Sequence, residues 1–146
     1  MLKKVGVVVI FIFLIIFIVF GYNFFSMRQH PYNKSMESIW SITLPDSYEC
    51  VYSLNEDTNG ILGDGDRYHI LQYYDEPSFD KEISWDEELH HLNEAINVLE
   101  NLKVDISPED FTQKDSQYHF QEKGNNKLWM IYDGNSRTLH IIERIM

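Results

Sequence analysis

The chain has 146 residues and a formal net charge of −11, with 23 acidic against 12 basic residues. Lys3 and Lys4 precede all the acidic residues, so the rest of the chain carries 10 basic residues (12 minus 2) and a net charge of −13. This charge repels nucleic acid and anionic lipid headgroups, and it favours cations, a basic partner or solubility alone. The length allows one ordinary hydrophobic core.

An uncharged apolar run extends from Val5 to Phe20. Counted to Phe25 it has about 21 residues, which as a helix of ~1.5 Å rise per residue spans a hydrocarbon core of ~30 Å. A lone segment in lipid must satisfy its own backbone hydrogen bonds, which favours a helix. We therefore predict an uncleaved transmembrane anchor at residues 5–25. A cleaved signal peptide and a buried helix of a soluble protein remain alternatives, although no A-x-A-like cleavage site follows the run.

Basic residues flanking the anchor predict its orientation. Lys3 and Lys4 lie close to one end, whereas Arg28 and Lys34 lie further from the other. By the positive-inside rule, the tip at residues 1–4 is expected in the cytoplasm and the C-terminal part outside. The sequence thus predicts a single-pass protein of the cell membrane, with a stalk at residues 26–38 and an extracytoplasmic domain at residues 39–146.

The local patterns predict an α+β domain in the order β-β-β-α-β-β-β. The helix has a capping-box pattern at Ser84 and Glu87, followed by leucines and isoleucine at helical spacing. A mostly antiparallel sheet packed by this one amphipathic helix is the economical arrangement. The expected strands are residues 39–44, 48–54, 67–74, 117–122, 127–132 and 138–145, and the expected helix is 86–103.

Cys50 is the only cysteine, so no disulfide within the chain can form. It lies in a predicted strand that places Tyr48, Cys50, Tyr52 and Leu54 on one face. We therefore predict a buried structural thiol, with a reactive or intermolecular thiol as the alternative.

The loop from residue 55 to residue 66 resembles a twelve-residue calcium loop in its spacing. Asn55, Asp57 and Asn59 take the first alternate oxygen-ligand positions, and Asp66 takes the twelfth. Asn at the first position and Asp at the last depart from the usual pattern. The loop is therefore either a calcium site or a polar hairpin loop rich in turn formers.

The segment from Gly63 to His69 packs several chemically useful side chains closely together. Asp64, Asp66, Arg67 and His69 are the candidate binding residues, and an anchored hydrolase would draw its acid and base from this segment. The alternative is a turn that enters a strand and carries an Asp–Arg pair on its rim.

A second cluster lies on the polar side of the predicted helix. Glu87 with His91, and His90 with Glu94, are each four residues apart, so their side chains can meet. Such residues can supply part of a zinc site, which needs three or four ligands, or they form a solvated helix face. No nucleophile elbow, Walker A motif or dinucleotide fingerprint occurs in the sequence.

The GDGDRYH segment, after a tyrosine-rich strand and behind a bare anchor, resembles small membrane-anchored proteins of unknown function from Gram-positive bacteria. The resemblance covers residues 44–74 and implies no activity and no catalytic residues. From the anchor and the acidic domain we expect a non-enzymatic module that binds a protein or cell-envelope partner, for example as an immunity-type protein. An anchored hydrolase and a calcium-dependent module are the alternatives.

Overall fold

A computed structural model describes residues 31–56, 64–81, 83–86 and 91–146. The tip at residues 1–4 and the anchor at residues 5–25 lie outside these ranges, so their predictions stay predictions. Among the residues described, no helix is both long enough and apolar enough to cross a membrane.

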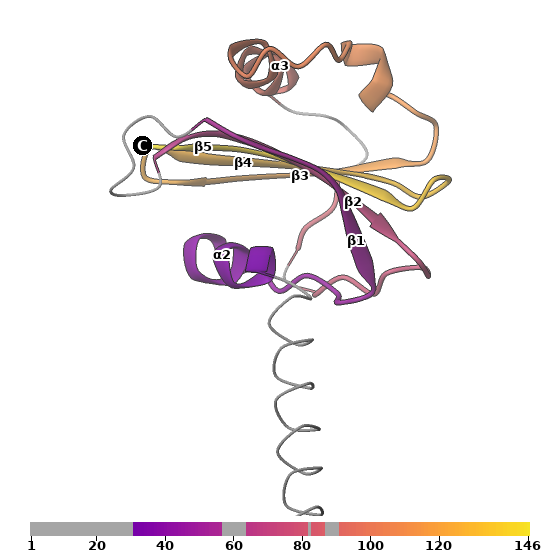
Figure 1. The fold of residues 1–146 in the computed structure, drawn as a ribbon. Coiled ribbons are helices and arrows are strands. Elements are labelled where there is room, and N and C mark those ends of the chain that lie inside the picture. The colour runs from indigo at the N-terminus through magenta and orange to yellow at the C-terminus, as the bar shows by residue number, and fades with distance from the viewer. Residues whose placement is uncertain (1–30, 57–63, 82, 87–90) are drawn as a thin grey trace, which may run out of the picture.

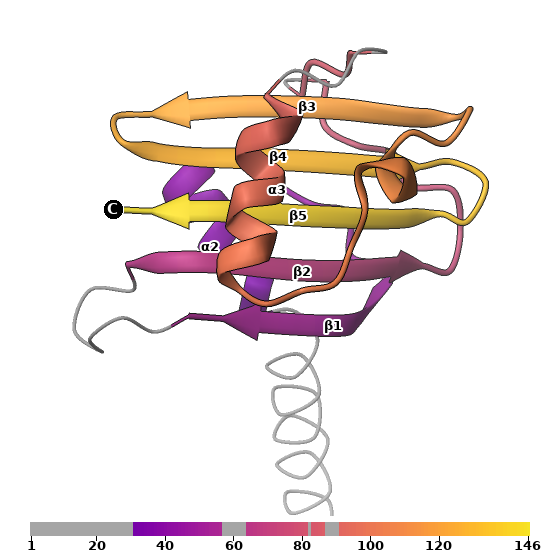
Figure 2. The same cartoon turned by 90° about the horizontal axis from the view of Figure 1, so that it is seen from above.

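A five-stranded sheet forms the middle layer of the domain, and all its strand pairs are antiparallel. Its order is β1-β2-β5-β4-β3, so β5 lies at the centre and β1 and β3 are the edges (Figure 2). The strands are β1 (Tyr48–Asn55), β2 (Gly65–Tyr73), β3 (Ser116–Lys123), β4 (Asn126–Asp133) and β5 (Thr138–Ile145).

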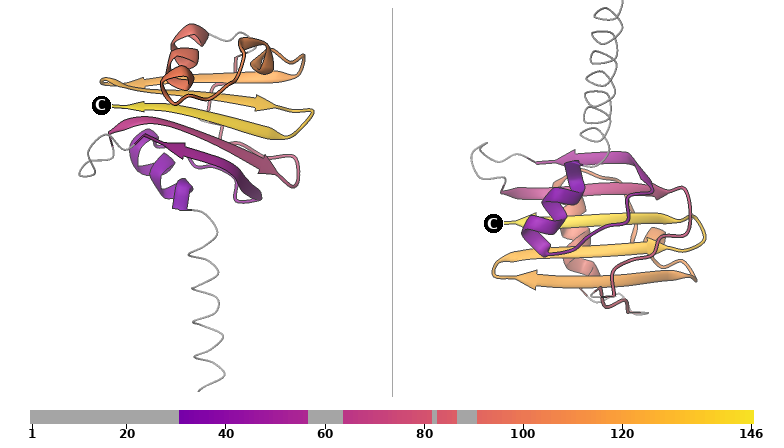
Figure 3. Two further views of the ribbon diagram at one scale, coloured as in Figure 1. Left: turned by 45° about the horizontal axis from the view of Figure 1, so that its top comes forward. Right: turned by 90° about the horizontal axis from the view of Figure 1, so that it is seen from below.

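Helices cover both faces of the sheet (Figure 1). Helix α2 (Pro31–Trp40) lies on one face, and α3 (Leu92–Asn101) with the 3-10 helix η1 (Pro108–Phe111) lies on the other. Figure 3 shows α2 crossing several strands when the sheet is seen from below. Since side chains alternate along a strand, each face supplies its own core. The α2 core includes Met36, Trp40, Leu71, Met130 and Ile141, and the α3 core includes Tyr68, Val98, Leu99, Trp129 and Ile142.

The predicted α+β class with a mainly antiparallel sheet is confirmed, but the predicted start of the domain is wrong. Residues 31–38, expected in the stalk, belong to α2, and the strand expected at residues 39–44 is absent. The reason is the spacing of Tyr32, Met36 and Trp40, which places three large side chains on one helix face. Met36 and Trp40 are completely or almost completely buried. Ser41 ends α2 with a left-handed φ of 61° and donates its N–H to the carbonyl of Glu37 at 3.0 Å.

Strand β1 contains an irregularity that separates the residues predicted to share one face, and the prediction that Cys50 is buried is also wrong. The register shifts between Cys50 and Tyr52, so Cys50 pairs with Leu71 of the α2 core and Tyr52 pairs with Ile70 on the α3 side. A bulge of this kind changes the face to which the following side chains point. Tyr48 and Leu54 therefore face opposite sides of the sheet. Cys50 comes before the shift and lies opposite the buried Leu71, yet on this edge strand its side chain is exposed rather than buried.

The predicted helix is present, but it is shorter than expected. α3 begins at Leu92, and Asp86 forms a β-bridge with Tyr118 instead of belonging to the first helical turn. Glu87, the partner of Ser84 in the expected capping box, lies outside the described residues. Ala95, Val98 and Leu99 are buried against the sheet, as the apolar stripe predicts.

Candidate functional site

The four residues predicted as a binding site lie along the start of β2, and the sheet separates them. Successive side chains of a strand point to opposite faces. Asp66 therefore lies on the α3 side, whereas Arg67 and His69 lie on the α2 side, where the ring of Tyr32 contacts the His69 ring in a tilted arrangement. Asp64 is exposed before the strand begins. Asp66 and His69 consequently do not converge on one substrate, so their placement gives no support to a hydrolase built from this segment.

Asp66 is engaged in a buried ion pair. Its two carboxylate oxygens accept bonds from Nε and Nη2 of Arg144, both at 2.9 Å, and Asn101 donates to it at 3.1 Å. The bidentate geometry is the strong form of this contact, and the Asp66 hydrogen bond raises the pKa of Arg144. Both oxygens that a calcium ion would need are thus already used.

The rest of the proposed calcium loop is only partly described. Asn55 is the last residue of β1, and Asp57 and Asn59 lie outside the described residues. Within the part of the chain that the structure describes, no three or more His, Cys, Asp or Glu side chains gather as a metal site would require.

The structure brings together a group of polar side chains beneath α2 that the sequence analysis missed. Glu143 of β5 is completely buried, and its oxygens accept hydrogen bonds from Trp40 Nε1 at 2.6 Å and the Tyr32 hydroxyl at 2.8 Å. The Tyr32 ring lies 4.2 Å from the ring of His69, measured between centroids. Arg67 is the register neighbour of Glu143 on β2. We call these five residues the Glu143 cluster.

Burial dominates the electrostatics of the Glu143 cluster. It lowers the pKa of His69 to about 4, with a further contribution from the positive charge of Arg67, so His69 is neutral at pH 7. Burial, followed by the nearby Glu143, raises the pKa of Tyr32 well above its ordinary value. Tyr32 and Trp40, which donate these hydrogen bonds to Glu143, both belong to α2, so the cluster attaches this helix to the central strand.

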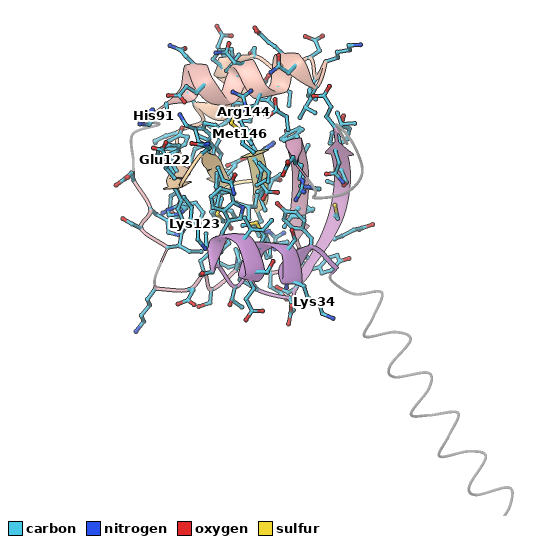
Figure 4. All side chains as sticks on the ribbon, turned by 90° about the vertical axis from the view of Figure 1, so that its left-hand side faces the viewer. Lys34, His91, Glu122, Lys123, Arg144 and Met146 are labelled. Carbon is cyan, nitrogen blue, oxygen red and sulfur yellow. The ribbon has the colours of Figure 1, made fainter. Side chains whose placement is uncertain are left out.

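The end of α2 is held by two further polar contacts with the edge strand β3. Lys123 donates from Nζ to the carbonyl of Ile39 at 2.8 Å, and Gln121 donates to the carbonyl of Trp40 at 3.2 Å. A cation at the C-terminal end of a helix also suits its dipole. Figure 4 shows Lys123 beside α2, while Arg144 and His91 lie toward α3.

The helix cluster proposed as part of a zinc site is also only partly described. Glu87 and His90 lie outside the described residues. Glu94 contacts His91 Nδ1 at 2.9 Å and Lys127 Nζ at 2.5 Å, and the Lys127 hydrogen bond is the main reason why its pKa is lowered. Glu94 therefore forms an ion pair with Lys127, and His91 contacts the same carboxylate.

The two edges of the sheet differ in how their backbone is covered. On β3, Tyr118 exchanges two main-chain hydrogen bonds with Asp86, at 2.8 and 2.9 Å, and the carbonyl of Ser84 contacts His119. On β1, residues 49–53 are all exposed, and no main-chain bond of the described residues covers them in this way. We call residues 49–53 the β1 edge.

Large apolar side chains are concentrated at the β1 edge. Val51 is 54% exposed and Tyr52 is 40% exposed. Tyr74, 61% exposed, lies just beyond the strand that pairs with β1, and its hydroxyl contacts Glu49 at 3.5 Å. These are three of the four large hydrophobic side chains exposed among the described residues. Partial burial raises the pKa of the neighbouring Cys50 thiol, so its reactive thiolate form is disfavoured.

Comparison with family models, with curated proteins and with solved structures finds no significant match to this chain.

Proposed function

We propose that this chain is a membrane-tethered, non-enzymatic binding domain that acts outside the cytoplasm on a protein or cell-envelope partner. The observation that carries the proposal is the β1 edge, where Val51 and Tyr52, with Tyr74 beside them, are exposed on a strand that no other described segment covers. Exposed apolar side chains at one place on an otherwise charged surface are typical of an interaction site. Immunity-type binding of a basic toxin is one version of this role.

The chemistry of the described residues supports binding rather than catalysis. Asp66 is paired with Arg144, and Glu143 accepts bonds that hold α2 in place. The Cys50 thiol has a raised pKa and donates to the carbonyl of Tyr52 at 3.2 Å. The carboxylates of Asp66 and Glu143 therefore have structural roles, and the Cys50 thiol is poorly activated.

Photo-cross-linking from the β1 edge tests the proposal. A photoreactive amino acid replaces Val51 in the full chain, and the matched control places it at Gln117, which is exposed on the opposite edge strand β3. After illumination of intact membranes, we expect a discrete adduct from position 51 and none from position 117. Equal labelling from both positions, or no adduct from either, would refute a binding role for this edge.

The proposed location has a separate test. If the residues from 31 onward lie outside the cytoplasm, added protease should digest them in spheroplasts without lysis. Digestion only after the membrane is broken would place the domain in the cytoplasm.

A further inference from the structure

We propose that the β1 edge binds an extended, basic segment of the partner as an additional strand of the sheet. This inference rests on the proposed function, and it specifies both the mode of binding and the chemistry of the partner. Addition of a strand to an exposed sheet edge gains affinity from main-chain hydrogen bonds and specificity from alternate side chains.

The register of β1 shows which backbone groups are available to such a strand. Glu56 donates its N–H to the carbonyl of Asp66 at 2.9 Å, so these two residues form a hydrogen-bonded pair. Pairs of this type alternate along an antiparallel ladder. The N–H and C=O groups of Ser53 and Asn55 therefore point away from β2, toward the position of an added strand.

The β1 edge lacks most of the features by which proteins protect an edge strand. Proteins commonly use lysine, proline, a bulge or a covering segment for this purpose. β1 contains neither lysine nor proline, and its bulge between Cys50 and Tyr52 leaves the regular stretch from Tyr52 to Asn55 available. The opposite edge, in contrast, is covered through the bridge between Asp86 and Tyr118.

The negative charge around β1 favours a basic segment over a second copy of this chain as the occupant of the edge. Asp46, Glu49 and Glu56 lie in β1 or beside its ends, and no lysine or arginine occurs between Lys34 and Arg67. Two β1 strands side by side would bring like charges together, which opposes association. A strand carrying lysine or arginine would be attracted instead, and its binding would weaken as salt screens the charges.

A peptide-binding experiment tests both parts of the proposal. The probe is a fluorescent synthetic peptide that alternates lysine with valine or threonine, and the full chain is used in uncharged detergent micelles. We expect binding, measured by fluorescence anisotropy, that weakens with added salt. The same peptide with glutamate in place of lysine should not bind.

Variants at position 53 test the main-chain pairing. Ser53→Pro removes an outward N–H from an edge position where proline is tolerated, and loss of one hydrogen bond should weaken binding roughly two- to tenfold. Ser53→Ala keeps the N–H and should stay within about twofold of the parent chain. If Ser53→Pro fails to fold, Glu49→Lys combined with Glu56→Lys provides a second test, in which preference should shift from the lysine peptide to the glutamate peptide.

Three results would overturn the inference. Unchanged binding by folded Ser53→Pro would exclude strand addition, and equal binding of the two peptides would exclude recognition of basic charge. If two chains cross-link through Cys50, and the lysine peptide does not lower the yield of this cross-link, the occupant of the edge is a second copy of the chain. If position 51 forms an adduct in membranes but the lysine peptide does not bind, the strand-addition inference fails and the proposed function stands. If there is neither an adduct nor peptide binding, the proposed function is refuted as well.

Discussion

Removing the hydroxyl of Tyr32 should destabilise the domain much more than removing the hydroxyl of Tyr132. In Tyr32→Phe the ring can keep its contact with His69, but the completely buried Glu143 loses the hydrogen bond that the Tyr32 hydroxyl donates. Leaving a buried acceptor without a hydrogen bond costs about 1–3 kcal/mol. For a domain of this size, each kcal/mol lowers the melting temperature by roughly 3–6 °C.

Tyr132→Phe is the matched control. The Tyr132 hydroxyl also contacts a glutamate, Glu76, at 3.2 Å, but Glu76 is exposed and water can replace the lost donor. We expect a loss of about 0.5 kcal/mol or less. Urea unfolding of the full chain in uncharged detergent, followed by tryptophan fluorescence, measures both variants. Equal losses for the two variants would refute the role assigned to Glu143.

The other polar contacts give three further predictions. Asp66→Asn should reduce the unfolding free energy by about 2–4 kcal/mol because it breaks the largely buried pair with Arg144. Glu94→Gln, which breaks the more exposed pair with Lys127, should have a much smaller effect, and urea unfolding measures both variants. His69 has a pKa of about 4 when folded and about 6.5 when unfolded, so the unfolded state binds more protons between these values. Stability should therefore fall as the pH drops from 6.5 toward 4, and His69→Gln should reduce this slope in unfolding measurements between pH 7 and 5. Since Arg144 occupies both oxygens of Asp66, calcium titration by calorimetry should give the same heat for the parent chain and for Asp66→Asn. A binding heat that the parent chain shows and Asp66→Asn lacks would restore the calcium hypothesis.

Strong local periodicity made the later strands and the helix predictable. β3 alternates polar with aromatic residues in its first half, β4 is a continuous apolar run between two turns, β5 alternates in part, and α3 has a regular apolar stripe. Helix α2 was not recognised because it is short, rich in polar residues and begins at Pro31. Proline is well suited to the first turn of a helix, so its presence there gave no reason to exclude one.

The arrangement of the candidate site depended on tertiary structure. The bulge in β1 has no marker such as glycine, so a regular alternation placed Tyr48, Cys50, Tyr52 and Leu54 on one face. Asp66 and His69 are close in sequence, yet the pleat directs them to opposite faces. One signal was available: Glu143 occupies an inward position in the apolar alternation of Leu139, Ile141 and Ile145, which marks a carboxyl group that needs buried partners.

The central position of β5 affects the order in which the domain can fold. β1 with β2 and β3 with β4 are each neighbours in sequence and can pair early, but β5 follows all four in the chain and must insert between them. Glu143 likewise meets Tyr32 and Trp40 across separations of 111 and 103 residues. Contacts of such long range form slowly, because closing the intervening loop costs entropy before the contacts are made. Before β5 has inserted, two half-sheets expose inner edges and apolar faces, so the chain is most open to aggregation and proteolysis during this interval of synthesis and folding.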